Sequence, residues 1–232
     1  MKTLGIIGGT GPESTIEYYK RLIAGYQARK PDGGAPAIII NSVDNKSLVD
    51  WFTAGKLGEI TEFLVREIGR LEGAGADFGL IAANTPHLVF DQVQKRVRLP
   101  LLSIVKATAD AASSAGLKRL ALFGTRFTMQ SQMFPATFSA RGLTIVTPGP
   151  AEQEFIHGKY MGELFIGEIR QETHAALLRI VEALKERDRI DALVLGGTEL
   201  SLIIREPTAA GLPVLDTTQI HVGAALDWML SE

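Results

Sequence analysis

The chain of 232 residues contains no cysteine. This absence excludes disulfide bonds, thiolate metal sites and thiol nucleophiles together. Histidine is also scarce: the four histidines lie far apart in the sequence, at positions 87, 157, 174 and 221, and form no zinc-type ligand cluster. The sequence therefore predicts neither a thiol enzyme nor a metal centre.

Charge of one sign and long apolar runs are lacking too. The net charge is -2 without a long run of Lys or Arg, which makes nucleic acid and anionic membrane poor partners. No segment reaches the roughly 20 apolar residues that span a bilayer, and the apolar stretch at the N-terminus is too short for a signal peptide. We therefore expect a cytoplasmic protein.

What is present is a regular alternation of short aliphatic runs and helical patterns. Nearly continuous aliphatic strands separated by helices indicate α/β architecture, with mainly parallel sheets covered on both faces. The first helix should place one apolar face inward, made of Ile16, Tyr19, Leu22, Ile23 and Tyr26. We expect strands at 3–9, 36–43, 77–83, 100–105, 119–124, 143–148 and 191–197, and helices at 12–27, 57–71, from 86 onward, at 107–116, 171–188 and 221–230.

The sequence also repeats itself at a nearly constant spacing. "IIGGT" resembles "LFGT" 115 positions later, "DFGLIAANT" resembles "DALVLGGTE" after 114, and "LPLLSIVKATADAA" resembles "LPVLDTTQIHVGAA" after 113. Three ordered matches predict two homologous domains related by a pseudo-twofold axis. We expect an N-terminal domain of residues 1–98 plus 209–232, with a returning C-terminal helix, and a second domain of residues 99–208.

Ligands of open parallel sheets bind beyond the carboxyl ends of the strands. The strand ends that match across the repeat are Gly8–Pro12, Ala83–His87, Gly124–Thr128 and Gly197–Glu199. If the two domains face each other, these four turns meet in one cleft, which we expect to be the site.

Each turn has two interpretations. "GGTGPEST", which contains Thr10, fits an anion-binding turn at a helix start and equally an ordinary tight turn. It is not a P-loop, and it lacks the third glycine of a dinucleotide fingerprint. In "ANTPH", Thr85 can cap a helix and Asn84 offers an amide; the repeat favours ligand contact for both, while His87 stays open.

The second half offers further polar candidates. Hydroxyls come from Thr125, Thr128 and Thr198, and Arg126 can provide a carboxylate fork. Glu199 has an alternative interpretation, because the helix dipole alone favours an acid in a first turn. Asp44 and Lys46 fit either a ligand contact or a solvated loop, Met129 and Met133 fit packing, and Lys159 and Tyr160 fit a lid.

These motifs, in this order along nearly the whole chain, resemble the aspartate/glutamate racemase superfamily. The residues that carry the resemblance are "GIIGGTGPEST", "ANTPH", "LFGTRFTM" and "LGGTELSLIIR", together with the internal duplication. The resemblance implies two pseudo-symmetric α/β domains, a cleft between them, often a homodimer, and an amino-acid racemase that uses neither pyridoxal phosphate nor a metal.

The resemblance also implies one catalytic cysteine in each half, before the Asn-Thr pair and before the Thr-Glu pair. In this chain those positions are Ala83 and Gly197, which the spacing of 114 residues pairs independently. Neither residue carries a proton, so the two-thiol mechanism cannot operate. The remaining acid or base candidates are His87, Glu199 and Asp44, with the threonine hydroxyls as poor ones.

The sequence is compatible with three functions. The first is a racemase-like isomerase that acts on a small amino or carboxylic acid without thiols, and the second is a decarboxylase, lyase or cis–trans isomerase acting on a small dicarboxylate. The third is a metabolite-binding protein that has lost catalysis. Aspartate itself is in doubt as a substrate, because Phe165 stands where the resemblance expects a basic residue, although Lys159 lies nearby.

Overall fold

The computed structural model describes residues 1–31 and 34–231, and the chain folds as two compact units. Unit 1 comprises Met1–Ile104 and Thr218–Glu232, and unit 2 comprises Val105–Thr217. Each unit contains a mainly parallel sheet with helices against it, which confirms the predicted fold class. Among the helices of the described ranges, none is both long enough and apolar enough to cross a membrane.

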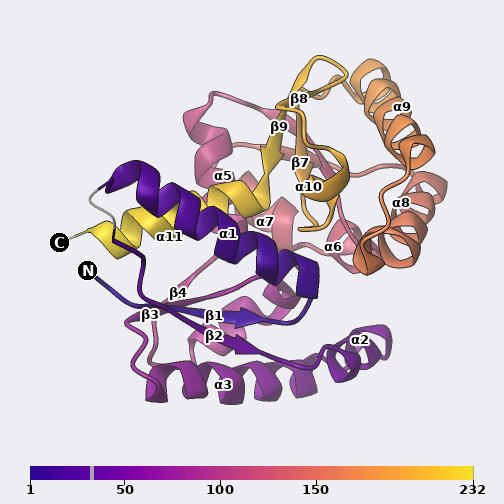
Figure 1. Ribbon diagram of the computed structural model, residues 1–232. Helices are drawn as coiled ribbons and strands as arrows, with labels where there is room; N and C mark the ends of the chain where they lie inside the picture. Colours follow the sequence, from indigo (N-terminus) through magenta and orange to yellow (C-terminus); the bar gives the residue numbers. More distant parts are fainter. Residues whose placement is uncertain (32–33, 232) are drawn as a thin grey trace. The chain divides into compact units, whose positions relative to one another are not determined.

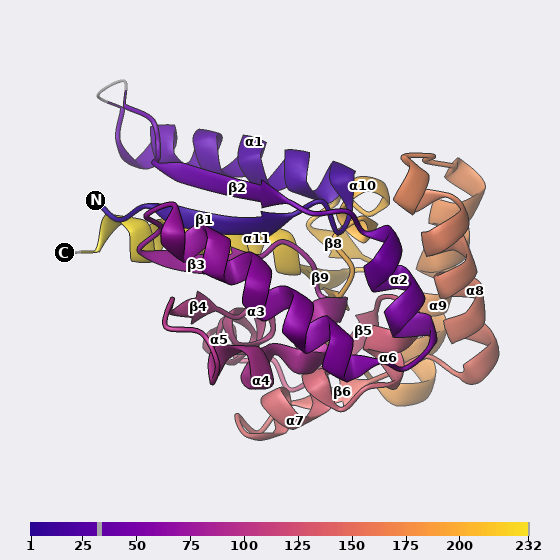
Figure 2. The ribbon, with the colours of Figure 1, turned by 90° about the horizontal axis from the view of Figure 1, so that it is seen from below.

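The sheet of unit 1 is parallel throughout, with its strands in the order β2-β1-β3-β4 (Figure 2). These strands are β1 (Leu4–Gly8), β2 (Ile38–Ser42), β3 (Phe78–Ile81) and β4 (Leu101–Leu102). Every residue of β1 and β3 is buried, because helices cover both faces of the central strands. Strand β4 is shorter than the predicted 100–105, since the next helix already begins at Ile104.

Two helix layers cover this sheet (Figure 1). On one face, α1 (Pro12–Arg29) and the unit 1 part of α11 (Thr217–Leu230) enclose Leu4, Ile6, Phe78 and Leu80. On the other face lie α2 (Lys46–Thr53), α3 (Leu57–Gly73) and α4 (Phe90–Gln94). Helix α2 begins at Lys46, although a solvated loop was one interpretation of the segment that contains Asp44 and Lys46.

The buried face of α1 differs from the predicted one. The helix buries Ser14, Tyr18, Leu22 and Tyr26, spaced four residues apart, and leaves Ile16 and Tyr19 each 47% exposed. The prediction that Ile16 and Tyr19 face inward is therefore wrong. Tyr18 is preferred inside because its hydroxyl finds a buried hydrogen-bond partner on α11, which hydropathy alone does not reveal.

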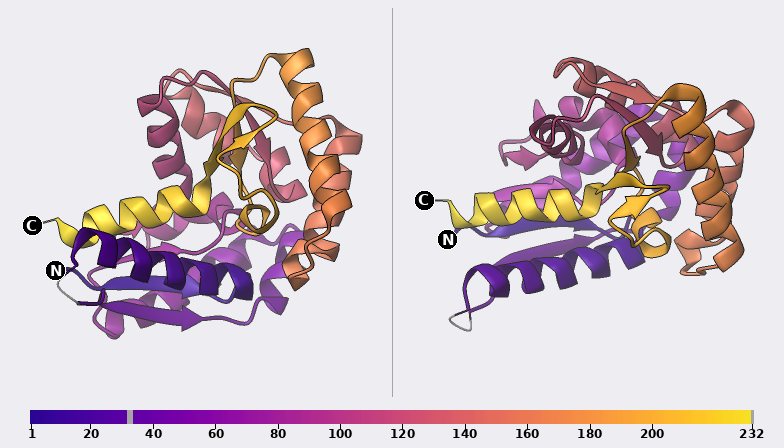
Figure 3. Two further views of the ribbon diagram at one scale, coloured as in Figure 1. Left: turned by 45° about the horizontal axis from the view of Figure 1, so that its top comes forward. Right: turned by 90° about the horizontal axis from the view of Figure 1, so that it is seen from above.

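Unit 2 has a sheet in the order β6-β5-β7-β9-β8, in which only the pairing of β8 with β9 is antiparallel among the described strands. Its strands are β5 (Arg119–Phe123), β6 (Thr144–Val146), β7 (Ala192–Leu195), β8 (Thr208–Ala209) and β9 (Leu212–Asp216). Helices α8 (Pro150–Gly162) and α9 (Gln171–Asp188) run side by side along one face (Figures 1 and 3). The other helices of this unit are α5 (Ile104–Ser114, in unit 2 from Val105), α6 (Arg126–Gln130), α7 (Met133–Ser139) and α10 (Leu200–Ile203).

The two units share one topology, as the sequence repeat predicts. Strands β1, β3 and β4 of unit 1 occupy the same places in the strand order as β5, β7 and β9 of unit 2. The correspondence extends to side chains: Asp77 accepts a hydrogen bond from the backbone N–H of Thr3 at 2.6 Å, and Asp191 accepts one from that of Lys118 at 2.7 Å. A side chain placed identically in both halves supports a duplicated fold.

The unit boundaries lie several residues beyond those proposed from the sequence, 98/99 and 208/209. The reason is strand pairing. Strand β4 is hydrogen-bonded to β3 and stays with unit 1, and β9 is hydrogen-bonded to β7 and stays with unit 2. The chain therefore leaves each unit only after the last strand of its sheet.

Candidate functional site

In unit 1 the first two candidate turns lie at one edge of the sheet. Strands β1 and β3 are parallel with Ile7 opposite Ile81, so the chain leaves both strands at neighbouring points. The first turn requires glycine: Gly9 has φ of 80°, and a Cβ there would lie 2.3 Å from the carbonyl oxygen of Val43. This close approach of two backbones brings the end of β2 beside the turn.

The polar groups of these turns are largely buried. The Ser14 hydroxyl donates to the carbonyl oxygen of Ala82 at 3.0 Å, which joins the start of α1 to the end of β3. The Oγ1 atom of Thr10 is buried and has no hydrogen-bond partner within residues 1–31 and 34–231. An unsatisfied buried hydroxyl requires an explanation, and a ligand oxygen is one. Asn84 is 3% exposed, while Thr85 is partly exposed.

The "ANTPH" turn forms the 3-10 helix η1 (Thr85–Val89), and His87 holds it in place. The Nδ1 atom of His87 lies 2.9 Å from the Ala83 carbonyl oxygen, and Nε2 accepts the N–H of Ile104 at 3.2 Å. Because a carbonyl only accepts, the proton must sit on Nδ1. Both nitrogens are therefore engaged with backbone. Asn84, rather than Thr85, occupies the N-cap position, and its side chain makes no capping hydrogen bond.

A second buried histidine lies beside His87. The Nδ1 atom of His221 is 2.8 Å from the Tyr18 hydroxyl, its Nε2 is 3.1 Å from the Leu102 carbonyl oxygen, and its ring centroid is 6.3 Å from that of His87. Burial, followed by the nearby His87, lowers the pKa of His221 to about 3. A neutral His221 thus joins α1, α11 and β4, a role that the sequence analysis missed because it depends on distant segments.

In unit 2 the turn after β5 is closed by its own threonines. Thr125 caps α6: its hydroxyl accepts the Thr128 N–H at 3.3 Å, and the two hydroxyl oxygens are 3.2 Å apart. The Arg126 guanidinium pairs with Glu154 at 3.3 Å, and its backbone N–H donates to Nδ1 of His157 at 3.3 Å. Burial and then Arg126 lower the pKa of His157. The structure places these groups beside the turn after β7, because Phe123 and Leu195 are register partners.

The turn after β7 contains an arrangement that the sequence analysis did not anticipate. A Cβ atom built on Gly197 would lie 2.4 Å from Cε2 and 3.2 Å from the hydroxyl oxygen of Tyr160. The phenol ring thus fills the space that a side chain at position 197 would occupy. The Tyr160 hydroxyl donates to Oε2 of Glu199, which also accepts from the Thr198 hydroxyl at 2.8 Å. All three side chains are at most 5% exposed.

The other polar candidates are engaged elsewhere. Asp44 accepts the backbone N–H of Lys46 at 3.0 Å at the start of α2, and the Lys46 ammonium pairs with Asp50 at 3.4 Å. Lys159 donates to Glu163 at 2.5 Å, and Phe165 packs against the core under α8. The structure thus gives Lys159 an ion-pair partner and Phe165 a packing role.

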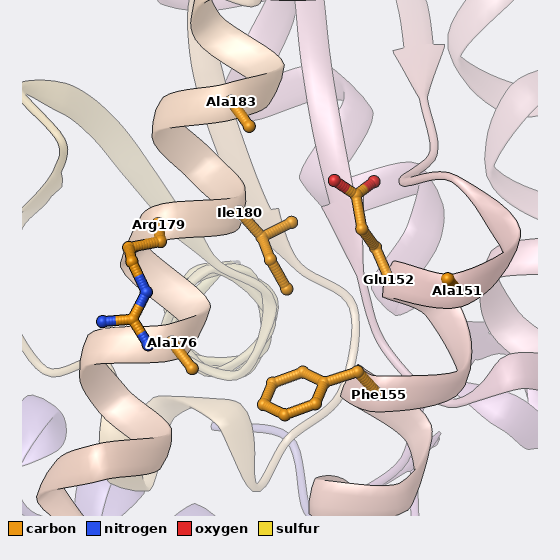
Figure 4. A pocket seen from close by; sticks show the side chains of 7 residues that line it. All are labelled: Ala151, Glu152, Phe155, Ala176, Arg179, Ile180 and Ala183. Atoms are coloured by element: carbon orange, nitrogen blue, oxygen red, sulfur yellow. The ribbon is translucent and has the colours of Figure 1, made fainter.

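A separate open groove of about 360 Å³ lies between α8 and α9. Phe155 and Ile180 project into it, with Glu152 and Arg179 at its sides (Figure 4). Glu152 is already occupied in the capping box of α8, where it accepts the Gly149 N–H at 2.6 Å. In the described part of the chain, no group of three or more His, Cys, Asp or Glu side chains is arranged to hold a metal ion.

Comparison with known proteins agrees with this architecture. The chain is 23% identical over 224 residues to the broad specificity amino-acid racemase RacX of Bacillus subtilis (strain 168), with 93% of this chain and 92% of RacX covered. The solved structure of a Yersinia pestis protein matches with a TM-score of 0.90 and 31% identity, covering 100% of both chains. An aspartate racemase homologue from Pyrococcus horikoshii matches with a TM-score of 0.86 and 34% identity, again over 100% of both.

The match to a protein family covers nearly the whole chain, from residue 7 to residue 225, and therefore includes the candidate turns of both units. The predicted resemblance is confirmed. The chain belongs to the Asp/Glu/Hydantoin racemase family.

Proposed function

We propose that this protein is a racemase-like isomerase that binds a small amino or carboxylic acid and moves the proton on its α-carbon without pyridoxal phosphate or metal. Family membership and the racemase relative support the reaction class. The observation that carries the proposal is the set of buried polar turns, two in each unit, at equivalent strand ends of a duplicated fold. We also propose a homodimer, which family membership supports.

The substrate carboxylate is assigned to the turn hydroxyls and amides. In unit 1, the buried Thr10 hydroxyl oxygen makes no hydrogen bond to any described residue, so a ligand oxygen would complete it. Asn84 and Thr85 follow β3 beside it, and Thr125, Thr128 and Thr198 are the candidate hydroxyls at the corresponding strand ends of unit 2. Substitution of Thr10 by valine should therefore weaken binding of the acid while preserving the shape of the side chain.

The chemistry cannot use thiols, because Ala83 and Gly197 stand at the two cysteine positions implied by the family. His87 is a poor replacement, since the lone pair of its Nε2 already accepts the Ile104 N–H. Its counterpart across the repeat, Ser201, likewise donates to a turn carbonyl, that of Thr198 at 2.8 Å. We therefore assign His87 to holding the turn and keep Glu199 as the candidate for proton transfer.

The test is exchange of the α-proton. The protein is incubated in D₂O with a panel of amino acids and small dicarboxylic acids, and loss of the α-proton signal is followed by NMR. The proposal expects enzyme-dependent exchange of at least one acid. A protein that binds an acid of the panel but exchanges none would contradict it.

One observation favours a non-catalytic alternative, a metabolite-binding protein: the Tyr160 ring fills the space next to Gly197. The same panel, measured by calorimetry, separates the two functions, because this alternative expects tight binding without exchange. The decarboxylase alternative is tested in parallel by CO₂ release from substituted malonates.

A further inference from the structure

The space beside Gly197 is filled by the side chain of Tyr160, whose phenol can donate and accept a proton. The Tyr160 hydroxyl oxygen lies 3.2 Å from the position that a Cβ of residue 197 would take. Tyr160 comes from α8 and Gly197 follows β7, so the replacement depends on tertiary packing within unit 2.

We propose that Tyr160 and Glu199 together form the proton-transfer group of unit 2 and replace the second thiol of the family. The proposal rests on the proposed function, because it names the groups that carry out that reaction. Tyr160 is the residue that meets the substrate α-carbon, and Glu199 is the final acceptor of the proton.

The geometry of the pair fits a relay. Oε2 of Glu199 accepts hydrogen bonds from Tyr160 and from Thr198 at 2.8 Å, so this oxygen is already oriented toward the phenol proton. The residues are 5% and 2% exposed, and water competes little for the contact. Burial and then Glu199 raise the pKa of Tyr160 well above its ordinary value, so the phenol stays protonated until it can pass its proton on.

In the first step, the α-C–H bond of the bound acid breaks and its proton forms a new O–H bond with Tyr160. The original phenol proton moves to the Glu199 carboxylate at the same time. The products are the substrate carbanion, a neutral tyrosine and a neutral carboxylic acid. The reverse transfer returns a proton to carbon, and deuterium enters once the pair has exchanged with D₂O.

This arrangement favours proton abstraction over decarboxylation. With Glu199 as acceptor, the pair begins as a base. If Tyr160 donated its proton to the carbanion that loss of CO₂ leaves, the resulting phenolate would lie next to the Glu199 carboxylate. Two adjacent anions in a buried site are costly.

The equivalent position in unit 1 has no such group. Ala83 ends in a methyl group, and the nearby His87 uses both ring nitrogens on backbone atoms. We therefore place the protein's acid/base pair in unit 2 alone, with the proton for the opposite face of the α-carbon coming from solvent.

The experiment compares α-proton exchange in D₂O by the parent chain, Tyr160→Phe and Glu199→Gln, two substitutions that preserve side-chain shape. Tyr26→Phe removes another buried phenol hydroxyl, which contacts Met1 in unit 1, and Glu67→Gln neutralises another buried carboxylate. Circular dichroism melting verifies that each variant is folded. We expect Tyr160→Phe and Glu199→Gln to lose roughly 100-fold or more of the exchange rate, and the two control variants to stay within about threefold of the parent.

The outcomes separate the two proposals. Exchange that persists at the parental rate in either Tyr160→Phe or Glu199→Gln overturns the relay and leaves the isomerase function standing. Absence of exchange by the parent chain, with every acid of the panel, overturns the isomerase function and the relay together.

Discussion

Ala83 and Gly197 are equivalent by sequence, yet their surroundings differ. Ala83 is partly exposed, and its carbonyl oxygen accepts a hydrogen bond from His87. Gly197 is buried, and the Tyr160 ring lies against it where a side chain would begin. Cysteine can therefore be restored readily at one position and not at the other.

Gly197→Cys should destabilise the protein by about 1–3 kcal/mol, because a Cβ would lie 2.4 Å from the Tyr160 ring in a packed interior. Ala83→Cys is the matched control and should change the free energy of unfolding by less than about 0.5 kcal/mol, since a Cβ is already present there. Urea denaturation measures both effects.

Thiol labelling adds a second readout, because the parent chain contains no cysteine and each variant carries one. Cys introduced at the partly exposed position should react readily with a disulfide reagent, and Cys introduced at the buried position slowly. Equal stability and equal reactivity of the two variants would show that Tyr160 does not occupy the space beside Gly197.

His221 should make the protein sensitive to acid. Its pKa is about 3 in the folded chain against an ordinary 6.5, so the unfolded state binds the proton first as the pH falls. The contribution of neutral His221 to the free energy of unfolding is fully present above pH 6.5. It is lost at about 1.4 kcal/mol per pH unit as the pH falls toward 3. Unfolding free energies between pH 7 and pH 4 measure this slope.

His221→Gln removes the titrating group and keeps polar atoms near Tyr18 and Leu102. The variant should be less stable at pH 7. Its free energy of unfolding should also decrease less steeply as the pH falls, by the slope that corresponds to one bound proton. Identical slopes for the two proteins would mean that His221 is not buried in the neutral form.

Among the helices of unit 2, α8 contributes side chains to both candidate turns. It carries His157 beside the turn after β5 and Tyr160 beside the turn after β7, three positions apart and thus on one helix face. At its C-terminal end, Glu163 accepts hydrogen bonds from Lys159 at 2.5 Å and from Thr173 of α9 at 2.6 Å. The Glu163 carboxylate thereby fixes α8 to α9.

Glu163→Ala should cost about 2–3 kcal/mol, because it leaves a buried hydroxyl and a lysine without their acceptor. Although burial opposes it, the hydrogen bonds from Lys159 and Thr173 lower the pKa of Glu163 below 4.5. The stabilisation is therefore present above pH 4.5 and is lost as the pH falls through the lowered value. Thermal melts at pH 7 and pH 4 should show the variant closer to the parent at pH 4.

Glu168→Ala is the control, since its ion pair with Arg170 at 2.7 Å lies at the surface and should contribute less than about 1 kcal/mol. A Glu163 variant that melts like the Glu168 variant would contradict the role given to α8.

Sequence patterns predicted some helices and their buried faces correctly and others incorrectly. The helix predicted at 171–188 is α9 itself, because its polar outer face and apolar stripe give a clear period. The inward face of α1 was predicted incorrectly, since Tyr18 is buried by a hydrogen bond rather than by hydropathy. The interpretation of Lys159 and Tyr160 as lid residues did not reveal that Tyr160 packs against Gly197, a contact across 37 sequence positions that no local pattern encodes.

At the scale of the whole chain, the duplication was visible because it preserves strand ends and the aspartates before the central strands, Asp77 and Asp191. The same duplication predicted which turns correspond. It did not predict that one of them would be filled by a tyrosine, because Tyr160 lies outside the repeated motifs. Nor did it predict that the other would be held by His87, because that role depends on the contact with Ile104, 17 positions away. Within each unit the fold follows from the sequence, while the chemistry of each turn depends on long-range packing.

We propose that this member of the racemase family, although it contains no cysteine, still moves an α-proton. The most direct measurement is the loss of the α-proton NMR signal in D₂O across the panel of amino acids and dicarboxylic acids, for the parent chain beside Tyr160→Phe. We expect exchange of at least one acid by the parent and roughly 100-fold slower exchange by the variant. No exchange by the parent, or equal exchange by both proteins, would contradict it.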